Sequence, residues 1–156
     1  MEPKTPQTRI LLVEGDPVQR MLLREYLEYV TGFNVVEPHG AFHVLSLCEY
    51  DRLCPDLILL DMEWAKAEGI PLCLEIWKRN PDVPVLGMTD RQTELYDDKR
   101  LHGHPIALIR KPFSPPQLHR SIAAMLRAKA IRAREALLRA RSGLHAMRVT
   151  SKGLRQ

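Results

Sequence analysis

Residues 55–69 read PDLILLDMEWAKAEG, and the four apolar residues 57–60, directly before Asp61, decide the fold class. Successive side chains of a strand point to opposite faces, so an unbroken apolar run predicts a strand covered on both faces, as in a parallel sheet. Similar short runs occur at residues 10–13, 33–36, 84–88 and 106–109. We therefore expect five strands, the third of which ends at Asp61.

Helical patterns separate these runs. Helices are expected at residues 17–30, 41–50, 71–79 and, from a weaker and more polar pattern, 91–101. Ser114 and Gln117 have the spacing of a capping box, and helix-forming residues follow to about residue 141, where Ser142 and Gly143 look like a stop. Strands that alternate with helices predict an α/β domain with a parallel sheet and helices on both faces.

The composition is that of a globular chain, with 45% hydrophobic and 27% charged residues among 156. No apolar run approaches the ~20 residues that a membrane span requires, and the first nine residues lack the apolar segment of a signal peptide. The three cysteines show no paired metal-ligand spacing, which indicates buried, inert thiols in a reducing compartment. We expect a cytoplasmic protein.

Charge is distributed unevenly along the chain. Residues 117–156 hold ten Lys or Arg residues and the single acid Glu135, a net charge of +9. Residues 1–116 hold 13 basic and 18 acidic residues, a net charge of −5. The basic character therefore belongs to the C-terminal segment and not to the predicted α/β domain.

Polar residues follow the predicted strands at the point where each strand ends. Glu14 and Asp16 follow the first strand, Asp61 ends the third, Thr89 follows the fourth and Lys111 follows the fifth. In open parallel sheets, ligands bind outside the carboxyl ends of the strands. Carboxylates suit Mg²⁺, while an ammonium and a hydroxyl suit phosphate oxygens. The pattern favours a phosphoryl site with a divalent cation.

Four segments, LLVEGDP, PDLILLDMEWAKAEG, PVLGMTD and IRKPF, resemble the signature segments of response-regulator receiver domains, in the same order. Gly69, eight residues after Asp61, matches the loop glycine of that family. The resemblance covers residues 9 to about 127. It implies a flavodoxin-like, doubly wound five-stranded parallel sheet in the order 2-1-3-4-5, here with an extended C-terminal helix.

The resemblance also implies roles for individual residues. Asp61 would be the phosphoacceptor, receiving a phosphoryl group from a histidine kinase or a phosphotransfer protein. Thr89 and Lys111 would bind that group, and the Lys111–Pro112 bond would be cis. Mg²⁺ would be held by Glu14, Asp61 and the backbone carbonyl of Glu63. Such a domain signals through protein–protein contacts and is not an enzyme in the ordinary sense.

The sequence departs from the family at several positions. Gly15 replaces the second acid after the first strand, so we expect Mg²⁺ to bind weakly unless Asp16 is a displaced ligand. The alternative role for Asp16 is to cap the helix that Pro17 begins. Leu108 occupies the position of the aromatic switch residue. The remaining departures are Ala65 in place of a loop proline and Asp90 in place of a small residue after Thr89.

We divide the chain into a receiver domain, residues 1–127, and a basic helical extension, residues 128–156. Seven residues of the helix follow alternating spacings of four and three, which predicts a heptad seam: Leu126, Ala130, Ala133, Leu137, Ala140, Leu144 and Met147. A homodimer through this seam is the favoured interpretation. The alternatives are a solvated extension or linker and, from its positive charge, a contact with nucleic acid or with an anionic membrane surface.

Other functions remain as alternatives. A pseudo-receiver would keep the fold as a binding module without phosphorylation or Mg²⁺. A nucleic-acid-binding regulator would act through the basic helix. A metal site at His102 and His104 lacks an evident third ligand, and a flavin protein is disfavoured because the loop after the first strand is acidic.

Overall fold

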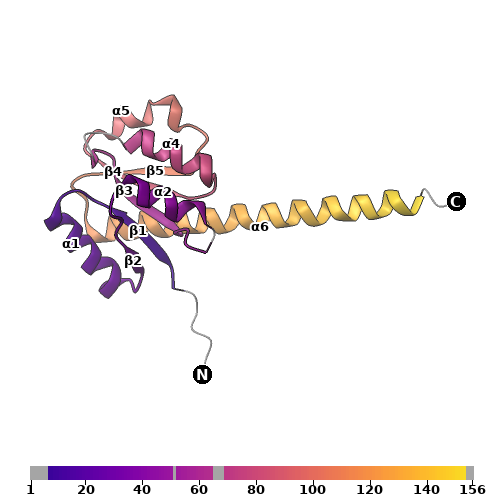
Figure 1. Cartoon of the computed structure of the whole chain (residues 1–156), viewed down its shortest axis with the longest axis horizontal. Coiled ribbons are helices and arrows are strands. Elements are labelled where there is room, and N and C mark those ends of the chain that lie inside the picture. The colour runs from indigo at the N-terminus through magenta and orange to yellow at the C-terminus, as the bar shows by residue number, and fades with distance from the viewer. Residues whose placement is uncertain (1–6, 51, 65–68, 154–156) are drawn as a thin grey trace, which may run out of the picture.

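A computed structural model describes residues 7–50, 52–64 and 69–153 (Figure 1). Its five strands are β1 (Arg9–Val13), β2 (Asn34–Val36), β3 (Leu57–Asp61), β4 (Val85–Thr89) and β5 (Ile106–Arg110). All neighbouring strands are parallel, and their order is β2-β1-β3-β4-β5. The predicted fold class and strand order are confirmed. Every residue of β3 and β4 is buried, as the unbroken apolar runs require.

The helices are α1 (Pro17–Glu25), α2 (Ala41–Glu49), α4 (Gly69–Arg79), α5 (Gln92–Tyr96) and α6 (Pro115–Gly153). A π-helical turn, Tyr26–Val30, continues α1, and a 3₁₀ turn, Lys99–Leu101, follows α5. The capping box at the start of α6 is formed, because the Ser114 N–H donates to Gln117 Oε1 (2.7 Å) and the Gln117 N–H donates to Ser114 Oγ (3.3 Å).

Alternating strand residues build two apolar cores, one on each face of the sheet. Leu11, Ile58 and Val85 belong to the core that α2, α4 and α5 cover. The second core contains Ile10, Leu59 and the side chains on the other face of β4. These side chains pack against α1, its π-helical turn and the first turns of α6. The two layers of helices leave the carboxyl ends of the strands at one open rim, and that rim positions the site.

The helix predicted at residues 91–101 is shorter than expected. It ends at Tyr96, and the Asp98 side chain accepts a hydrogen bond from the Arg100 N–H, which starts a separate 3₁₀ turn. Short acidic side chains bond readily to nearby backbone groups and so compete with helix continuation. The prediction of one continuous helix here was wrong.

The expected stop at Ser142 and Gly143 is also wrong, because α6 runs without a break to Gly153. A glycine ends a helix when it adopts a left-handed backbone, and Gly143 is not among the glycines with positive φ. A helical glycine costs only about 1 kcal/mol, which the surrounding helix-forming residues tolerate. Ser142 Oγ donates to the Leu138 carbonyl within the helix (3.1 Å).

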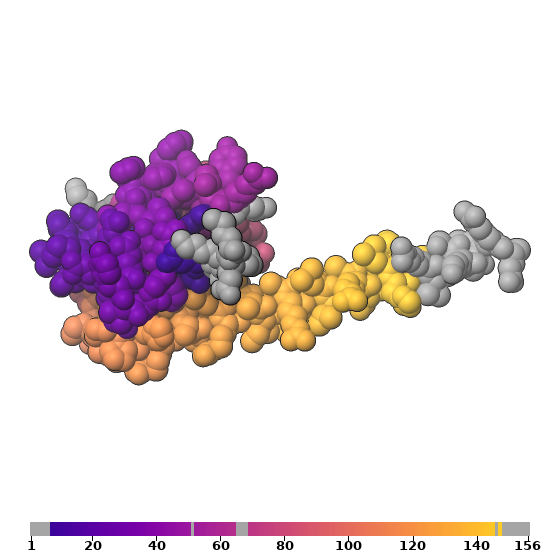
Figure 2. Space-filling view, turned by 90° about the horizontal axis from the view of Figure 1, so that it is seen from below, coloured from indigo at the N-terminus to yellow at the C-terminus, as the bar shows by residue number. Residues whose placement is uncertain are grey.

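Helix α6 has 39 residues, so its length is roughly 58 Å. Its first turns lie against the sheet, and the Lys129 ammonium is 3.7 Å from the Asp56 carboxylate. Beyond this ion pair the helix projects away from the domain (Figures 1 and 2). Leu137, Leu144 and Met147 of the predicted seam are between 64% and 73% exposed. The division of the chain at residue 127 stays a prediction.

The surroundings of the three cysteines and of His102 and His104 indicate structural roles for these residues. Cys48 and Cys73 are buried, and Cys54 is partly buried. Burial raises the pKa of Cys73 to about 12, so its thiol stays protonated and unreactive near neutral pH. The His104 ring stacks on Trp77 with ring centroids 4.3 Å apart, and His102 Nε2 lies 3.1 Å from the Tyr96 carbonyl oxygen.

Candidate functional site

The parallel register brings the predicted site residues to one rim of the sheet. Asp61 pairs with Met88, and Thr89 pairs with Arg110, so the ends of β3, β4 and β5 lie in sequence along the rim. The Lys111 N–H continues the ladder by donating to the Thr89 carbonyl (2.9 Å). The Lys111–Pro112 peptide bond is cis, as predicted.

Two carboxylates and an ammonium form the centre of the site. Lys111 Nζ lies 3.2 Å from Asp61 Oδ1 and 3.4 Å from Glu14 Oε2. Glu14 is 4% exposed and Asp61 is 8% exposed, so both carboxylates are shielded from water on most sides. Since one ammonium cannot fully neutralise two carboxylates, the cluster retains net negative charge and attracts a cation.

The ionisation of Lys111 reflects these neighbours. Burial disfavours the charged ammonium and by itself would lower the pKa of Lys111. The negative charges of Asp61 and Glu14, together with the hydrogen bonds to them, outweigh burial and raise the pKa above its ordinary value. Lys111 is therefore a fixed positive charge near neutral pH, ready to contact an anionic group.

Thr89 is fully buried at the end of β4, and its hydroxyl has two partners. It donates to Glu63 Oε1 at 2.6 Å and accepts a hydrogen bond from the Arg91 N–H at 3.0 Å. Glu63 Oε1 also lies 3.5 Å from Arg91 Nε. The loop after β3 and the loop after β4 are thus joined through one carboxylate oxygen.

The loop after β1 shows how Asp16 is used. Its Oδ1 accepts hydrogen bonds from the Val18 and Gln19 N–H groups, each at 2.9 Å, so Asp16 is the N-cap of α1. The capping interpretation is confirmed, and metal ligation by Asp16 stays an untested prediction. A Cβ added at Gly15 would lie 3.3 Å from Trp64 Cδ1. The Trp64 ring therefore lies close against Gly15 and would have to move by a few tenths of an ångström to admit a side chain there.

The donor set can be compared with what Mg²⁺ requires. Among the residues that the structure describes, no group of three or more His, Cys, Asp or Glu side chains could hold a metal ion. Glu14 and Asp61 are nevertheless close neighbours, since both contact Lys111 Nζ. Mg²⁺ is commonly bound by one or two carboxylates and keeps several waters. The two buried carboxylates therefore fit Mg²⁺.

The loop glycine has a packing role at the site. A Cβ on Gly69 would lie 2.6 Å from the carbonyl oxygen of Met62, closer than real Cβ contacts come. Only glycine lets α4 begin so near the backbone that follows Asp61. Ala65 lies outside the described residues.

Leu108 is buried at 8% exposure, and its side chain packs over Gly87 in the neighbouring strand. Its carbonyl oxygen accepts hydrogen bonds from Gln92 Nε2 (3.0 Å) and from the Tyr96 hydroxyl (3.4 Å), both on α5. The buried Leu108 therefore holds α5 through its backbone and has no ring to swing outward. Asp90 is exposed.

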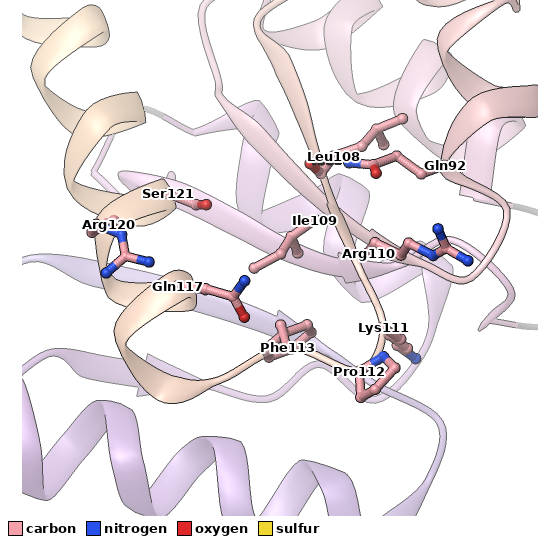
Figure 3. Close-up of a pocket in the computed structure, with 10 residues that line it drawn as sticks. All are labelled: Gln92, Leu108, Ile109, Arg110, Lys111, Pro112, Phe113, Gln117, Arg120 and Ser121. Atoms are coloured by element: carbon pink, nitrogen blue, oxygen red, sulfur yellow. Dashed lines mark hydrogen bonds between the residues drawn. The ribbon is translucent and has the colours of Figure 1, made fainter.

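A hollow of about 590 Å³ continues from the site along the outer side of β5 (Figure 3). Its lining includes Gln92 of α5, Arg110 and Lys111 at the end of β5, and Gln117 and Arg120 of α6. No acidic side chain is among the ten residues that line it. Lys111 thus belongs to the anion-attracting rim of this hollow as well as to the carboxylate cluster.

Two contributions to the site were not predicted from the sequence. The family resemblance points only to the backbone carbonyl of Glu63, and it assigns no role to Arg91. Both residues lie two positions after a predicted site residue, namely Asp61 and Thr89. That placement in the rim loops is the signal that could have identified them.

A flavodoxin-like α/β domain with an acidic strand end, a buried threonine and a lysine at one rim is the kind of domain that serves in phosphoryl signalling. The chain belongs to the response regulator receiver domain family, whose model matches residues 10–123. It is therefore a receiver domain of two-component systems. Within the described residues, no helix is long and apolar enough to span a membrane.

Among curated proteins, the chain is 34% identical over 123 residues to transcriptional regulatory protein BaeR of Escherichia coli O6:H1, covering 76% of this chain and 48% of BaeR. It is 29% identical over 119 residues to response regulator MprA of Mycobacterium avium, covering 76% of this chain and 51% of MprA. The chain thus spans about half the length of these relatives.

Two crystal structures show the same fold. The receiver domain of sensor histidine kinase PA1611 from Pseudomonas aeruginosa PAO1 has a TM-score of 0.65 and 24% identity, with 77% of this chain and 98% of that chain covered. That structure has a magnesium ion in its active-site cleft. A CheY-like receiver domain protein from Methanospirillum hungatei JF-1 has a TM-score of 0.67 and 22% identity, with 81% and 98% covered.

Proposed function

We propose that this receiver accepts a phosphoryl group on Asp61 from the phosphohistidine of a histidine kinase or a phosphotransfer protein. The observation that carries the proposal is the contact between Lys111 Nζ and Asp61 Oδ1, 3.2 Å, at the end of β3. A carboxylate beside a fixed ammonium can attack a phosphorus atom while the ammonium compensates charge on the phosphoryl oxygens.

The transfer balances as a displacement at phosphorus. A carboxylate oxygen of Asp61 forms a bond to phosphorus, the bond from phosphorus to the imidazole nitrogen breaks, and the imidazole keeps that electron pair. Lys111 would exchange one carboxylate contact for a phosphoryl oxygen. Thr89 would donate a hydrogen bond from its hydroxyl to a second phosphoryl oxygen.

Glu14, Asp61 and the Glu63 carbonyl would hold Mg²⁺, more weakly than in a receiver with a second acid at position 15. When bound, the cation would compensate negative charge at the phosphoryl oxygens. Glu14, with a side chain 1% exposed, would remain in place as the anchoring carboxylate.

A phosphodonor protein has to reach Asp61 from outside the rim. A hollow of about 500 Å³ between α1 and the start of α6 borders Lys111 and is mostly apolar, with Leu22, Leu23, Tyr26 and Phe113 among its lining residues. Leu22 is 56% exposed there. This hollow is the surface that we propose for contact with the donor protein, because it combines exposed apolar area with a residue of the site.

The receiver would pass its signal on through protein–protein contacts, and we propose a homodimer through the exposed seam of α6. The exposure of Leu137, Leu144 and Met147 supports this proposal. Nucleic-acid binding through the basic extension is the alternative, and it predicts an affinity that falls steeply with salt. We also propose that the chain works in the cytoplasm and is not an enzyme in the ordinary sense.

The proposal is tested by incubating the chain with acetyl phosphate and Mg²⁺ and measuring its intact mass. The expected result is a gain of one phosphoryl group that is absent from Asp61→Asn. The gain should be lost at alkaline pH, because an acyl phosphate is hydrolysed there. A wild-type chain that gains no phosphoryl group, from acetyl phosphate or from a phosphohistidine donor, would instead support a pseudo-receiver.

A further inference from the structure

The hydroxyl of Thr89 has no donor capacity to spare. A hydroxyl group can donate only one hydrogen bond. The Thr89 hydroxyl donates its hydrogen bond to Glu63 Oε1 at 2.6 Å, which is a short distance. Its acceptor is a carboxylate oxygen, which carries charge when it is ionised. The hydroxyl oxygen also accepts the Arg91 N–H at 3.0 Å. Thr89 is fully buried, so its hydroxyl is shielded from water.

Glu63 is held in this position from two sides. Its backbone N–H donates to Asp61 Oδ1 at 3.1 Å, which ties it to the proposed phosphoacceptor. Its Oε1 lies 3.5 Å from Arg91 Nε, and Arg91 NH1 also lies 3.6 Å from Glu94 Oε2 on α5. The Glu63 side chain is 32% exposed, so it has room to turn toward solvent when its bond to Thr89 breaks.

We propose that Glu63 is a positioning residue that holds the Thr89 hydroxyl in the resting state and competes with a phosphoryl group for it. This inference rests on the proposed function of Asp61. Phosphoryl oxygens without a proton can only accept hydrogen bonds. Thr89 can therefore bind a phosphoryl oxygen only by breaking its hydrogen bond to Glu63. The Glu63 carboxylate and an incoming phosphoryl group also repel each other.

The competition has a predicted consequence. Removing the Glu63 carboxylate frees the Thr89 hydroxyl and removes a negative charge, so an anion on Asp61 should bind more tightly. The loss of one competing hydrogen bond to a charged group corresponds to an affinity gain of roughly ten-fold. The gain must act through Thr89 and should therefore disappear when the hydroxyl is absent.

The experiment is a calorimetric titration of the full chain with beryllofluoride, a phosphoryl mimic, at saturating Mg²⁺. Glu63→Ala is expected to bind roughly ten-fold more tightly than wild type. Glu63→Gln is expected to fall between them, because its amide oxygen still accepts from Thr89 but carries no charge. Glu94→Ala is the matched control, because it removes the other carboxylate beside Arg91. Its affinity should equal that of wild type.

The decisive readout is a double-mutant cycle with Thr89→Val. In the Thr89→Val background, Glu63→Ala should change the affinity much less than it does in wild type, because the two residues act through one bond. Equal gains in both backgrounds would reduce Glu63 to a general charge effect and overturn the inference. Weaker binding by Glu63→Ala, as expected if its carboxylate were a metal ligand, would overturn it as well.

The outcomes separate this inference from the proposed function. If wild type is phosphorylated on Asp61 but Glu63→Ala binds beryllofluoride no more tightly, the function stands and the role of Glu63 is wrong. If wild type is not phosphorylated but Glu63→Ala binds the mimic and wild type does not, the role of Glu63 stands. If neither protein binds the mimic, the role of Glu63 is refuted.

Discussion

Lys111 Nζ lies 3.2 Å from Asp61 Oδ1 although Lys111 follows β5 and Asp61 ends β3, and these strands are separated by β4. The long lysine side chain crosses the end of the intervening strand, where Thr89 is buried. A shorter basic side chain could not span two strand spacings of about 4.8 Å each. This contact therefore depends on strand order as well as on residue type.

Lys111→Met should destabilise the domain by about 2 kcal/mol near pH 7, because it leaves Asp61 and Glu14 without their shared cation. The pKa of Lys111 is raised in the folded state, so its stabilisation is fully present below about pH 10 and is lost as the pH rises through the folded pKa. Urea unfolding of both proteins at several pH values should show the difference shrinking above about pH 10.

Lys78→Met is the control for that measurement, because the Lys78 side chain is 70% exposed and pairs with Glu75 at the surface. It should change the free energy of unfolding by less than about 0.5 kcal/mol. A Lys111→Met variant as stable as the Lys78→Met variant at neutral pH would show that the carboxylate cluster does not need its ammonium.

Gly15→Asp should raise the affinity for Mg²⁺ by roughly ten-fold, because a third carboxylate joins Glu14 and Asp61. Its Cβ would lie 3.3 Å from Trp64 Cδ1, so the Trp64 side chain has to shift by a few tenths of an ångström. Isothermal titration with Mg²⁺ measures the effect, and Gly15→Ala provides the same Cβ without a carboxylate. Equal affinities for the Asp and Ala variants would refute the idea that the missing acid weakens the site.

Asp16→Ala should cost about 1 kcal/mol of stability, while Asp16→Asn should cost little, because asparagine is an equally good N-cap. Both changes should leave the Mg²⁺ affinity unchanged if capping is the only role of Asp16. Thermal unfolding and Mg²⁺ titration of the two variants test both statements. A loss of Mg²⁺ affinity in the well-folded Asp16→Asn protein would identify Asp16 as a displaced ligand.

Leu137→Glu should convert a dimer to a monomer, because it places a charge in the predicted α6 seam, where Leu137 is 66% exposed. Leu138→Glu is the matched control: the side chain is of the same type, is 53% exposed and lies outside the seam. Sedimentation equilibrium distinguishes the two states. If wild type is a monomer throughout the measured concentration range, dimerisation through α6 is excluded.

The fold could be predicted from sequence because its determinants are local and repeated. The apolar runs at β3 and β4 are buried on both faces, and the polar residues that end them lie at one rim by the geometry of a parallel sheet. Capping by Asp16, one of the two roles that the sequence leaves open, is indicated for a similar reason, since Pro17 follows it.

The bond between Glu63 and Thr89 was not predictable in the same way. It joins two loops, and nothing local to either residue indicates that the carboxylate turns toward the hydroxyl. The sequence predicts too short an α6, because a glycine ends a helix only when it adopts a left-handed backbone, and Gly143 does not adopt one.

The most direct measurement is a crystal structure of the chain with Mg²⁺ and beryllofluoride. We predict beryllium bonded to a carboxylate oxygen of Asp61, with fluorine atoms within hydrogen-bonding distance of Lys111 Nζ and of a Thr89 hydroxyl that has left Glu63. An Asp61 side chain without beryllofluoride, or a bound complex that neither Lys111 nor Thr89 contacts, would contradict the proposal that these three residues hold one phosphoryl group.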